Sequence, residues 1–436
     1  MLLNPVVFSV IVMSVLCLLK LNVIISLIVA AIVGGLLAGM PISDIMGTLV
    51  GGMGGNAETA LSYILLGALA AAIHQTGLAT ILSKKIASAI KGKGTVLLIL
   101  IAIIACFSQN LIPVHIAFIP ILIPPLLGVM NKLKIDRRAA ACALTFGLKT
   151  PYIALPVGFG LIFHGIIADQ MTQNGMEMAK MDVWKGLWLP GLGMIIGLLV
   201  AIFISYRKPR EYKNEDIVME ETAAATDEPV KITKAHYAAL AGALAALVIQ
   251  LTIGSLPLGA LVGLGIMVAF GAIKWSSLDE LMSSGIGMMG FIAFVMLVAS
   301  GYGNVIRETN GVEALVNATA SIVGGSKLLA AVVMIILGLI ITMGIGTSFG
   351  TIPIIAVIYV PLALKIGFSP LATAVLIGTA AALGDAGSPA SDSTLGPTSG
   401  LNADGQHDHI WDTCVPTFLH YNIPLVIFGV IGALIF

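Results

Sequence analysis

The chain has 436 residues, of which 22 are basic and 22 are acidic, so its formal net charge is zero. Charged residues make up 10% of the sequence and apolar residues 58%, whereas a soluble domain carries about 25% charged residues. This composition excludes a secreted, cytosolic or nucleic-acid-binding protein, since no basic field is present to attract phosphates. At roughly 20 residues per membrane-spanning helix, it predicts an all-α polytopic membrane protein with about 10–12 membrane segments.

The first half of the chain contains apolar runs separated by polar or glycine-rich breaks. The first run has no basic region before it and no small-residue cleavage site after it, which predicts a retained span rather than a signal peptide. The predicted runs of this half cover residues 2–19, 22–40, 58–76, 95–130, 139–168 and 186–206.

A long charged stretch at residues 207–235 separates these runs from a second set and predicts a solvated linker. The predicted domains are therefore a first repeat over residues 1–206, the linker over 207–235 and a second repeat over 236–436. The predicted runs of the second half cover residues 236–254, 257–273, 286–303, 328–366, 369–402 and 414–436.

Basic residues in short loops indicate which side of the membrane a loop occupies, because Lys and Arg accumulate on the cytoplasmic side. Three basic clusters flank the runs of the first half, and all three are expected in the cytoplasm together with the linker. They comprise Lys84, Lys85, Lys91 and Lys93; Lys132, Lys134, Arg137 and Arg138; and Arg207, Lys208 and Arg210.

The run at 95–130 must leave the cytoplasm and return to it, because basic clusters lie on both sides of it. Its middle is broken by Ser108-Gln109-Asn110, and about 36 residues are short for two complete crossings. We therefore predict a re-entrant helical hairpin, which needs protein or an aqueous cavity around its tip. The next run is interrupted at Gly147–Pro151, where proline removes an amide donor and opposes a continuous helix.

The second half repeats this order of a broken long run followed by a second broken run. The long run is interrupted at Gly344–Gly350 and the next one at Gly384–Pro389. Pro125 and Pro361 lie 236 residues apart, and other Gly and Pro pairs recur at a similar spacing, which indicates a duplication. The two halves begin on opposite sides of the membrane, so the repeats are predicted to be inverted. Inverted repeats with paired interrupted helices are typical of secondary transporters, whose binding site lies near the membrane midplane.

Four interruptions would meet at the axis between such repeats and offer carbonyl oxygens, helix ends and small polar side chains. An oxygen-rich, weakly charged cluster of this kind suits a hard cation such as sodium. The alternative is that the hydroxyl groups only cap the broken helices by bonding to local backbone. The predicted sodium ligands at the breaks are Asn110, Thr150, Thr347, Ser348, Asp385 and Ser388, with Ser108 as a further candidate.

Asp385 is the sharpest of these signals, because an ionised residue at membrane depth costs about 2.5–3.5 kcal/mol and usually faces a pathway or a partner. It could bind the cation directly or exchange a proton for it. The corresponding zone of the first half carries Lys149 instead of an acid. Lys149 could pair with Asp385, including in a purely structural salt bridge, or it could bind a substrate carboxylate. Asp392 is a second candidate acid.

The segment Gly384–Thr394, with the sequence GDAGSPASDST, resembles the G-D-x-x-S-P-x-S-D-T signature of the NhaC-type sodium/proton antiporters, although Ser393 replaces its threonine. This family belongs to a wider ion transporter superfamily that includes an amino-acid (histidine-type) permease-like branch. The resemblance implies a multi-pass protein of the cell inner membrane, often a homodimer, with a scaffold part and a moving transport part. It also implies an ion site at the matched positions Asp385, Ser388, Pro389, Ser391 and Asp392.

Two functions stay open at this point. In sodium/proton antiporter-type exchange, sodium and protons compete for Asp385. In the alternative, sodium- or proton-coupled symport, Lys149 and residues at the breaks bind an amino acid such as histidine or a small carboxylate. The further substrate-binding candidates at the breaks are Gln109, Pro151 and Pro389.

Two other classes of protein fit the sequence poorly. An intramembrane hydrolase would rest on the G-x-S-x-G match at residues 346–350, which lacks a strand–turn–helix context. A passive channel would not need duplicated broken helices. We therefore expect a secondary active transporter and not an enzyme, with no cofactor other than sodium or protons as coupling ions. Its expected partners are membrane lipid and a monovalent cation.

Overall fold

The computed structural model describes residues 4–19, 21–78, 94–110, 119–213, 233–345, 347–389 and 391–436. Within these ranges the chain forms helices of several types and no strand. The predicted all-α fold class is therefore confirmed.

The first half of the chain forms a series of helices that ends in the π-helical segment η4. They are α1 (Pro5–Leu18), α2 (Val23–Leu37), α3 (Ile42–Gly52), η1 (Met53–Asn56), α4 (Ala57–Gln75), α6 (Gly94–Asn110), α7 (Ile119–Lys132), α8 (Arg137–Ala154), α9 (Phe159–Gln173), η3 (Lys180–Asp182), α10 (Trp184–Val200) and η4 (Ala201–Ser205).

The second half forms a comparable series that includes two further π-helical segments, η6 and η7. They are α11 (Lys234–Ile253), α12 (Leu256–Ala269), η5 (Trp275–Ser277), α13 (Leu278–Glu308), α14 (Gly311–Val323), α15 (Lys327–Ile345), α16 (Ser348–Ile366), α17 (Pro370–Ala382), α18 (Asp392–Leu401), η6 (His409–Cys414), α19 (Val415–Thr417), η7 (Phe418–Asn422) and α20 (Ile423–Ile435).

Several of these helices are long and apolar enough to cross a membrane. Among the described residues five segments meet this test, and α8 together with α9 forms a bent pair that adds a sixth. Shorter apolar helices of 10–17 residues also occur among the described residues, and the predicted number of 10–12 membrane segments stays a prediction. The five segments are Ile42–Gln75, Trp184–Ser205, Met289–Glu308, Ser348–Ile366 and His409–Ile435.

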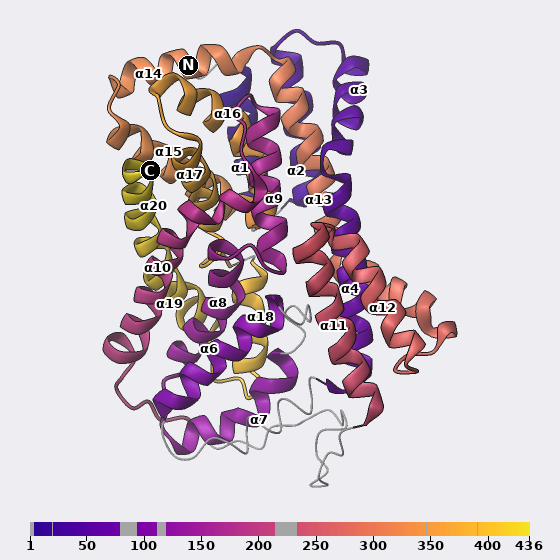
Figure 1. Cartoon of the computed structure of the whole chain (residues 1–436). Coiled ribbons are helices and arrows are strands. Elements are labelled where there is room, and N and C mark those ends of the chain that lie inside the picture. The colour runs from indigo at the N-terminus through magenta and orange to yellow at the C-terminus, as the bar shows by residue number, and fades with distance from the viewer. Residues whose placement is uncertain are drawn as a thin grey trace.

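Figure 1 shows two groups of helices side by side. The α13 group contains α1–α4 and α11–α13, in which α13 packs against α2, α3 and α4. The α8 group contains α6–α10 and α15–α20, in which α8 packs against α6 and α10, and α17 packs against α15 and α20. The helix α16 contacts both α13 and α9, so it joins the two groups.

The break after α8 lies later than the sequence predicts. The helix continues through Pro151, and Leu155 is the first extended residue, with φ −125° and ψ 133°. Because Leu155 precedes Pro156, it is forced out of the helical conformation, and this proline rather than Pro151 ends the helix. Gly158 then has φ +60°, and α9 is bent by 47° relative to α8. The prediction of an interrupted run is confirmed, but the interruption predicted at Gly147–Pro151 is wrong.

The predicted break at Gly384–Pro389 is confirmed, because it lies between the end of α17 and the start of α18. Gly384 has φ +75°, a conformation that L side chains rarely adopt. A Cβ at this position would also lie 2.8 Å from the backbone nitrogen of Met343, so only glycine fits here.

The two predicted hairpins differ in how well their tips were placed. In the second half, Thr347 is extended between α15 and α16, within the predicted break. In the first half, α6 remains helical through Ser108 and Gln109 to Asn110, so the predicted break at these residues is wrong. The connection from α6 to α7 falls at residues 111–118, outside the described residues.

By their order along the chain, α7, α8 and α9 of the first half correspond to α16, α17 and α18 of the second half. The contacts between the halves come in matching pairs. The helix α7 contacts α18 while α16 contacts α9, and α8 contacts α18 while α17 contacts α9. The helices α10 and α20 also pack together, and α6 and α7 lie at the lower end of Figure 1 while α15 lies at the upper end. A twofold relation between the halves would produce these pairings. The inverted repeats and the re-entry of the hairpins stay predictions.

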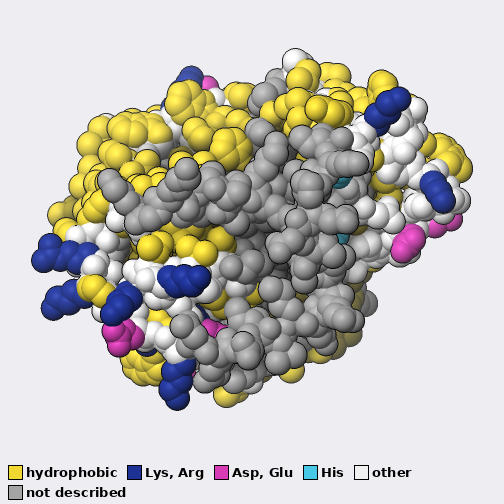
Figure 2. Space-filling view, turned by 90° about the horizontal axis from the view of Figure 1, so that it is seen from below, with side chains coloured by type: hydrophobic (Ala, Val, Ile, Leu, Met, Phe, Trp, Pro, Cys, Tyr) yellow, Lys and Arg dark blue, Asp and Glu magenta, His cyan; other side chains and the backbone are white. Residues whose placement is uncertain are grey.

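The lower end of the molecule carries a concentration of Lys and Arg side chains, visible on the left of Figure 2. The α7–α8 loop contributes the exposed Lys132 and Lys134, and the segment after η4 contributes the exposed Arg207 and Lys208. The amide of Arg210 donates to the carbonyl of Lys134 at 3.0 Å, which joins the two segments. Two of the three predicted basic clusters therefore lie at the same end.

Small residues allow α4 and α13 to approach closely. A Cβ at Gly285 would lie 2.5 Å from the backbone nitrogen of Ala68 and 2.7 Å from the carbonyl oxygen of Ile64. These neighbours are backbone atoms and cannot move aside unless the two helices separate. Close approach through small residues is a general mode of helix association in membranes.

We expect the substitution Gly285→Val to destabilise the fold by about 1–3 kcal/mol, because it overpacks the α4–α13 contact. Thermal unfolding of the purified protein in detergent measures this loss. The matched control is Gly287→Val on the same helix, where an added Cβ meets no atom within 4 Å. An equal loss in both variants would show that valine in this helix, and not the close contact, is responsible.

Candidate functional site

The Asp385 carboxylate is the centre of a buried polar network in the segment between α17 and α18. Asp385 is 5% exposed. Its Oδ2 accepts a hydrogen bond from the amide of Ser348 at 3.0 Å and one from the hydroxyl of Ser348 at 2.5 Å, and its Oδ1 accepts one from the hydroxyl of Ser391. Ser348 is the first residue of α16, so the carboxylate lies at a helix N-terminus, where the helix dipole favours negative charge.

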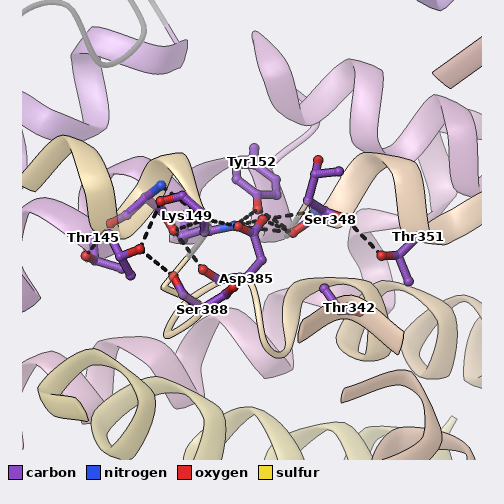
Figure 3. A network of polar contacts seen from close by, with 12 residues as sticks. Thr145, Lys149, Tyr152, Thr342, Ser348, Thr351, Asp385 and Ser388 are labelled. Carbon is purple, nitrogen blue, oxygen red and sulfur yellow. Dashed lines mark hydrogen bonds and ion pairs between the residues drawn. The ribbon is translucent and has the colours of Figure 1, made fainter. Parts of the chain in front are cut away.

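Lys149 reaches the same carboxylate from α8. Its ammonium group forms an ion pair with Asp385 and donates to the phenol oxygen of Tyr152 at 2.8 Å and to the Ser348 hydroxyl at 3.3 Å. The Tyr152 and Ser348 oxygens are also 2.9 Å apart, which closes the network shown in Figure 3. The structure therefore brings Lys149, Ser348 and Asp385 together from three separate segments.

Hydroxyl groups of α18 hold the broken segment beside Asp385. The Ser393 hydroxyl donates to the carbonyl oxygen of Asp385 at 2.9 Å and lies 2.9 Å from the Ser391 hydroxyl. The Thr394 hydroxyl donates to the carbonyl oxygen of Ser388 at 2.5 Å. Ser391 also caps α18 by accepting the amide of Ser393, so one hydroxyl both caps a helix and binds the carboxylate.

Other predicted site residues lie around this centre or away from it. Thr347 immediately precedes Ser348, and Asp392 is exposed at the first position of α18. Thr150 lies on another face of α8, where its hydroxyl donates to the sulfur of Met194 at 3.5 Å. The structure therefore does not place the Thr150 hydroxyl in the Asp385 network.

The remaining predicted site residues lie in α6, in α8 and in the break before α18. Ser108, Gln109 and Asn110 form the last turn of α6, and their side chains are outside the described part of the structure. Pro151 lies inside α8, one turn before its end. The Pro389 carbonyl lies 2.9 Å from Nε2 of His409, which belongs to the π-helical segment η6.

Tyr152 is a site residue that the sequence analysis missed. It lies three residues after Lys149, a spacing that places two side chains on the same face of a helix, and this was the available signal. The centre of the Tyr152 ring lies 5.2 Å from the centre of the Phe349 ring and 5.1 Å from that of the Phe163 ring. Phe349 also contacts Tyr63 of α4 at 5.7 Å, so an aromatic cluster beside the ion pair connects the two helix groups.

A second buried ion pair lies at the lower end of the molecule. The Arg137 guanidinium, 0% exposed, donates to both carboxylate oxygens of Asp404 at 2.6 and 2.5 Å. The guanidinium carbon of Arg137, Cζ, lies 4.2 Å from the ring centre of Tyr212. The start of α8, the segment after η4 and the loop after α18 are therefore joined. Among the described residues, no group of three or more His, Cys, Asp or Glu side chains that could hold a metal ion occurs, in this loop or elsewhere.

His407 in the same loop is buried and 2% exposed. Its Nε2 lies 2.7 Å from the Thr413 hydroxyl, and its Nδ1 has no hydrogen-bond partner among the described residues. Burial lowers the pKa of His407 to about 4, so the ring is neutral in the folded protein near neutral pH. Burial alone would raise the pKa of Asp404, but the hydrogen bonds to Arg137, the Arg137 charge and the backbone hydrogen bonds together lower it.

A helical, multi-pass chain with an acid–base pair buried beside a broken helix has the architecture of a membrane transporter. The model of the Na+/H+ antiporter family matches residues 143–430, and a second model, also described as a Na+-H+ antiporter family, matches residues 4–90. The chain therefore belongs to the Na+/H+ antiporter family, as the resemblance at Gly384–Thr394 implied.

Relatives of the whole chain agree with this assignment. An uncharacterized membrane protein of Vibrio parahaemolyticus is 52% identical over 99% of this chain and 100% of its own length. The protein named "Putative amino acid transporter YuiF" from Bacillus subtilis is 50% identical, again over 99% of this chain and all of its own length. An uncharacterized membrane protein of Haemophilus influenzae is 49% identical over the full length of both chains.

Two solved transporter structures share the fold at low sequence identity. The YdaH transporter of Alcanivorax borkumensis superimposes with a TM-score of 0.64 at 15% identity, covering 90% of this chain and 88% of its own. MtrF of Neisseria gonorrhoeae, titled as representing a class of antimetabolite efflux pumps, gives a TM-score of 0.63 at 14% identity, covering 89% and 84%. These likenesses concern the fold alone.

We expect Lys149→Met to destabilise the protein by about 3–5 kcal/mol, because it leaves the Asp385 carboxylate buried without its counter-charge. The double variant Lys149→Met/Asp385→Asn leaves no charge at this site and should lose less stability than the two single variants added together. Thermal unfolding in detergent measures all three. Lys180→Met is the control, since Lys180 pairs with Asp169 at 3.4 Å with both side chains 46% exposed. Strict additivity of the two single losses would contradict the coupling.

Because the folded state holds His407 neutral, protonation between pH 6.5 and 4 favours the unfolded state. The contribution of the neutral His407 ring to the free energy of unfolding is complete above pH 6.5. It declines as the pH falls toward 4, by about 3 kcal/mol at most. Unfolding midpoints recorded from pH 7 to pH 4.5 should therefore fall less steeply in His407→Asn than in the unmodified protein. Parallel curves would refute this assignment.

Proposed function

We propose that this protein is a secondary active transporter that exchanges sodium ions for protons at the Asp385–Lys149 pair, where Asp385 binds the cation and Lys149 carries the proton. The observation that carries the proposal is a buried carboxylate whose oxygens contact a cationic group, the Lys149 ammonium, and the hydroxyls of Ser348 and Ser391. Carboxylate and hydroxyl oxygens are ligands that hard cations prefer. A sodium ion and the ammonium group would compete for this carboxylate, because each needs it to offset the cost of a buried charge.

Exchange follows from this competition. A sodium ion that enters from one side displaces the Lys149 ammonium from Asp385, and burial disfavours the charged amine once its counter-charge is lost. Lys149 therefore gives one proton to water on that side. When the sodium ion leaves on the opposite side, Lys149 takes up a proton there and forms the ion pair again. Each cycle moves one sodium ion and one proton in opposite directions.

Residues around the pair would complete the sodium site and its approach. Thr347 and Ser388 lie in the non-helical backbone at the two breaks, where carbonyl oxygens can serve as additional ligands. Asp392 is exposed at the first position of α18. We assign it to the approach path, where a negative charge attracts cations.

We further propose that the basic lower face of Figure 2 lies in the cytoplasm and that the protein resides in the cell inner membrane. The support is the joining of two basic clusters at one end through Arg210 and Lys134, together with the cytoplasmic preference of such residues. This orientation places both ends of the predicted linker, residues 207–235, on the cytoplasmic side.

Sodium- or proton-coupled transport of an amino acid is the second candidate. The 50% identical relative from Bacillus subtilis bears the name of an amino acid transporter, which favours this alternative. Lys149 would then bind the substrate carboxylate. Because its ammonium group is already paired with Asp385, a substrate would have to replace that carboxylate.

Purified protein in liposomes separates the two functions. We expect an imposed sodium gradient to change the internal pH and to drive no uptake of a labelled amino-acid mixture. Asp385→Asn should abolish this sodium-dependent proton movement, because the amide cannot hold a cation as the carboxylate does. Asp169→Asn, which changes a half-exposed acid in a surface ion pair, should leave it intact.

A second variant tests the role of the Lys149 amine directly, on protein whose folded state is checked by its thermal unfolding in detergent. Lys149→Gln should still bind sodium but should release no protons on binding, as measured in detergent with a pH indicator. Proton release that persists in Lys149→Gln would contradict the role of Lys149. Sodium-driven amino-acid uptake without proton exchange would overturn the antiport proposal in favour of symport.

A further inference from the structure

A cavity of about 530 Å³ lies between α6, α8 and α10, beside the break that follows α8. It is separate from the Asp385 network, because it lies on the face of α8 that carries Thr150 rather than Lys149. Its walls are almost entirely carbon. The lining includes Cys106, Phe146, Thr150, Leu155, Trp188 and Ile195.

The mouth of this cavity is part of the apolar outer surface. Phe107, Leu155 and Trp188 line it and are 50%, 52% and 45% exposed. The helix α10 belongs to a segment, Trp184–Ser205, that is long and apolar enough to cross the membrane. The cavity therefore opens sideways toward the hydrocarbon of the bilayer and is continuous with the lipid-facing surface. Water would find few hydrogen-bond partners there.

We propose that this cavity binds one acyl chain of a membrane phospholipid. The occupant must be apolar because the lining offers little polar surface, and hydrocarbon chains are the apolar molecules present at this depth. A bound chain would contact Pro151 and Leu155, which border the break between α8 and α9. Pro151 is two residues from Lys149, so the chain would touch the helical turn that carries the ion pair.

Trp188 provides a reporter for this site. In a variant with Trp184, Trp275 and Trp411 changed to phenylalanine, Trp188 is the remaining tryptophan. Titration of this protein in detergent micelles with a phospholipid brominated on its acyl chain should quench Trp188 fluorescence in a saturable way. A matched variant that keeps only Trp184 is the control, because Trp184 lies one turn away on α10, is 38% exposed and does not line the cavity.

A filling substitution completes the test. Leu192 lines the cavity, so Leu192→Phe should weaken the saturable quenching of Trp188 by about tenfold in apparent affinity. Leu199→Phe adds the same volume to the lipid-facing side of the same helix, outside the cavity, and should leave the affinity unchanged. Equal quenching of Trp184 and Trp188 would mean ordinary mixing of lipid in the micelle and would overturn the proposal. Equal affinities in the two phenylalanine variants would overturn it as well.

Discussion

The arrangement of the broken helices depends on one buried carboxylate, Asp385, which is satisfied from three directions. Asp385 accepts hydrogen bonds from the first residue of α16 and from the cap of α18, and it pairs with a lysine from α8. A buried carboxylate without such partners would cost several kcal/mol, so these segments can meet only in an arrangement that supplies all of them. The requirement couples α16, the helix α8, the break between α17 and α18, and the contact between the two halves of the chain.

The broken backbone around Asp385 obeys the same constraint. Extended backbone inside a membrane protein must be buried in protein and have its polar groups satisfied. Leu383, Ala386 and Ser391 are each 0% exposed, and serine and threonine hydroxyls bind the carbonyl groups of the segment. The small polar residues that follow Asp385 therefore replace the hydrogen bonds that a continuous helix would have formed. The same serine and threonine hydroxyls therefore cap the broken helices and form part of the site.

The composition of the chain and the positions of its glycine, proline and charged residues made much of the fold and of the site predictable. The apolar content predicted the helical membrane fold, and Gly384 with Pro389 marked the break beside Asp385 correctly, since glycine and proline both oppose a regular helix there. The error in the first half arose because two prolines lie close together. Pro151 is tolerated inside α8, while Pro156 acts on Leu155 and ends the helix. Sequence alone does not reveal which of two nearby prolines the tertiary packing will accommodate.

Other features depended on contacts between distant segments and left no local pattern. The aromatic cluster of Tyr63, Phe349 and Tyr152 draws its rings from separate helices. Arg137 was assigned to a basic cluster that marks the cytoplasmic side, and nothing in its neighbours indicated that it is buried against Asp404. Pairing of Lys149 with Asp385 was one of several readings that the sequence left open, because a lone lysine and a lone acid carry no information about their separation in space.

The ion pair at the centre has an electrical consequence. Membrane potential acts on the net charge that crosses its field, at about 2.3 kcal/mol per elementary charge per 100 mV. The Lys149–Asp385 pair combines one positive and one negative charge, so displacement of the pair as a unit performs no electrical work. Replacement of the ammonium charge by a sodium ion beside a neutral amine would leave that sum at zero. The site can therefore move across the membrane field without electrical work, both as the Lys149–Asp385 ion pair and with sodium bound to Asp385.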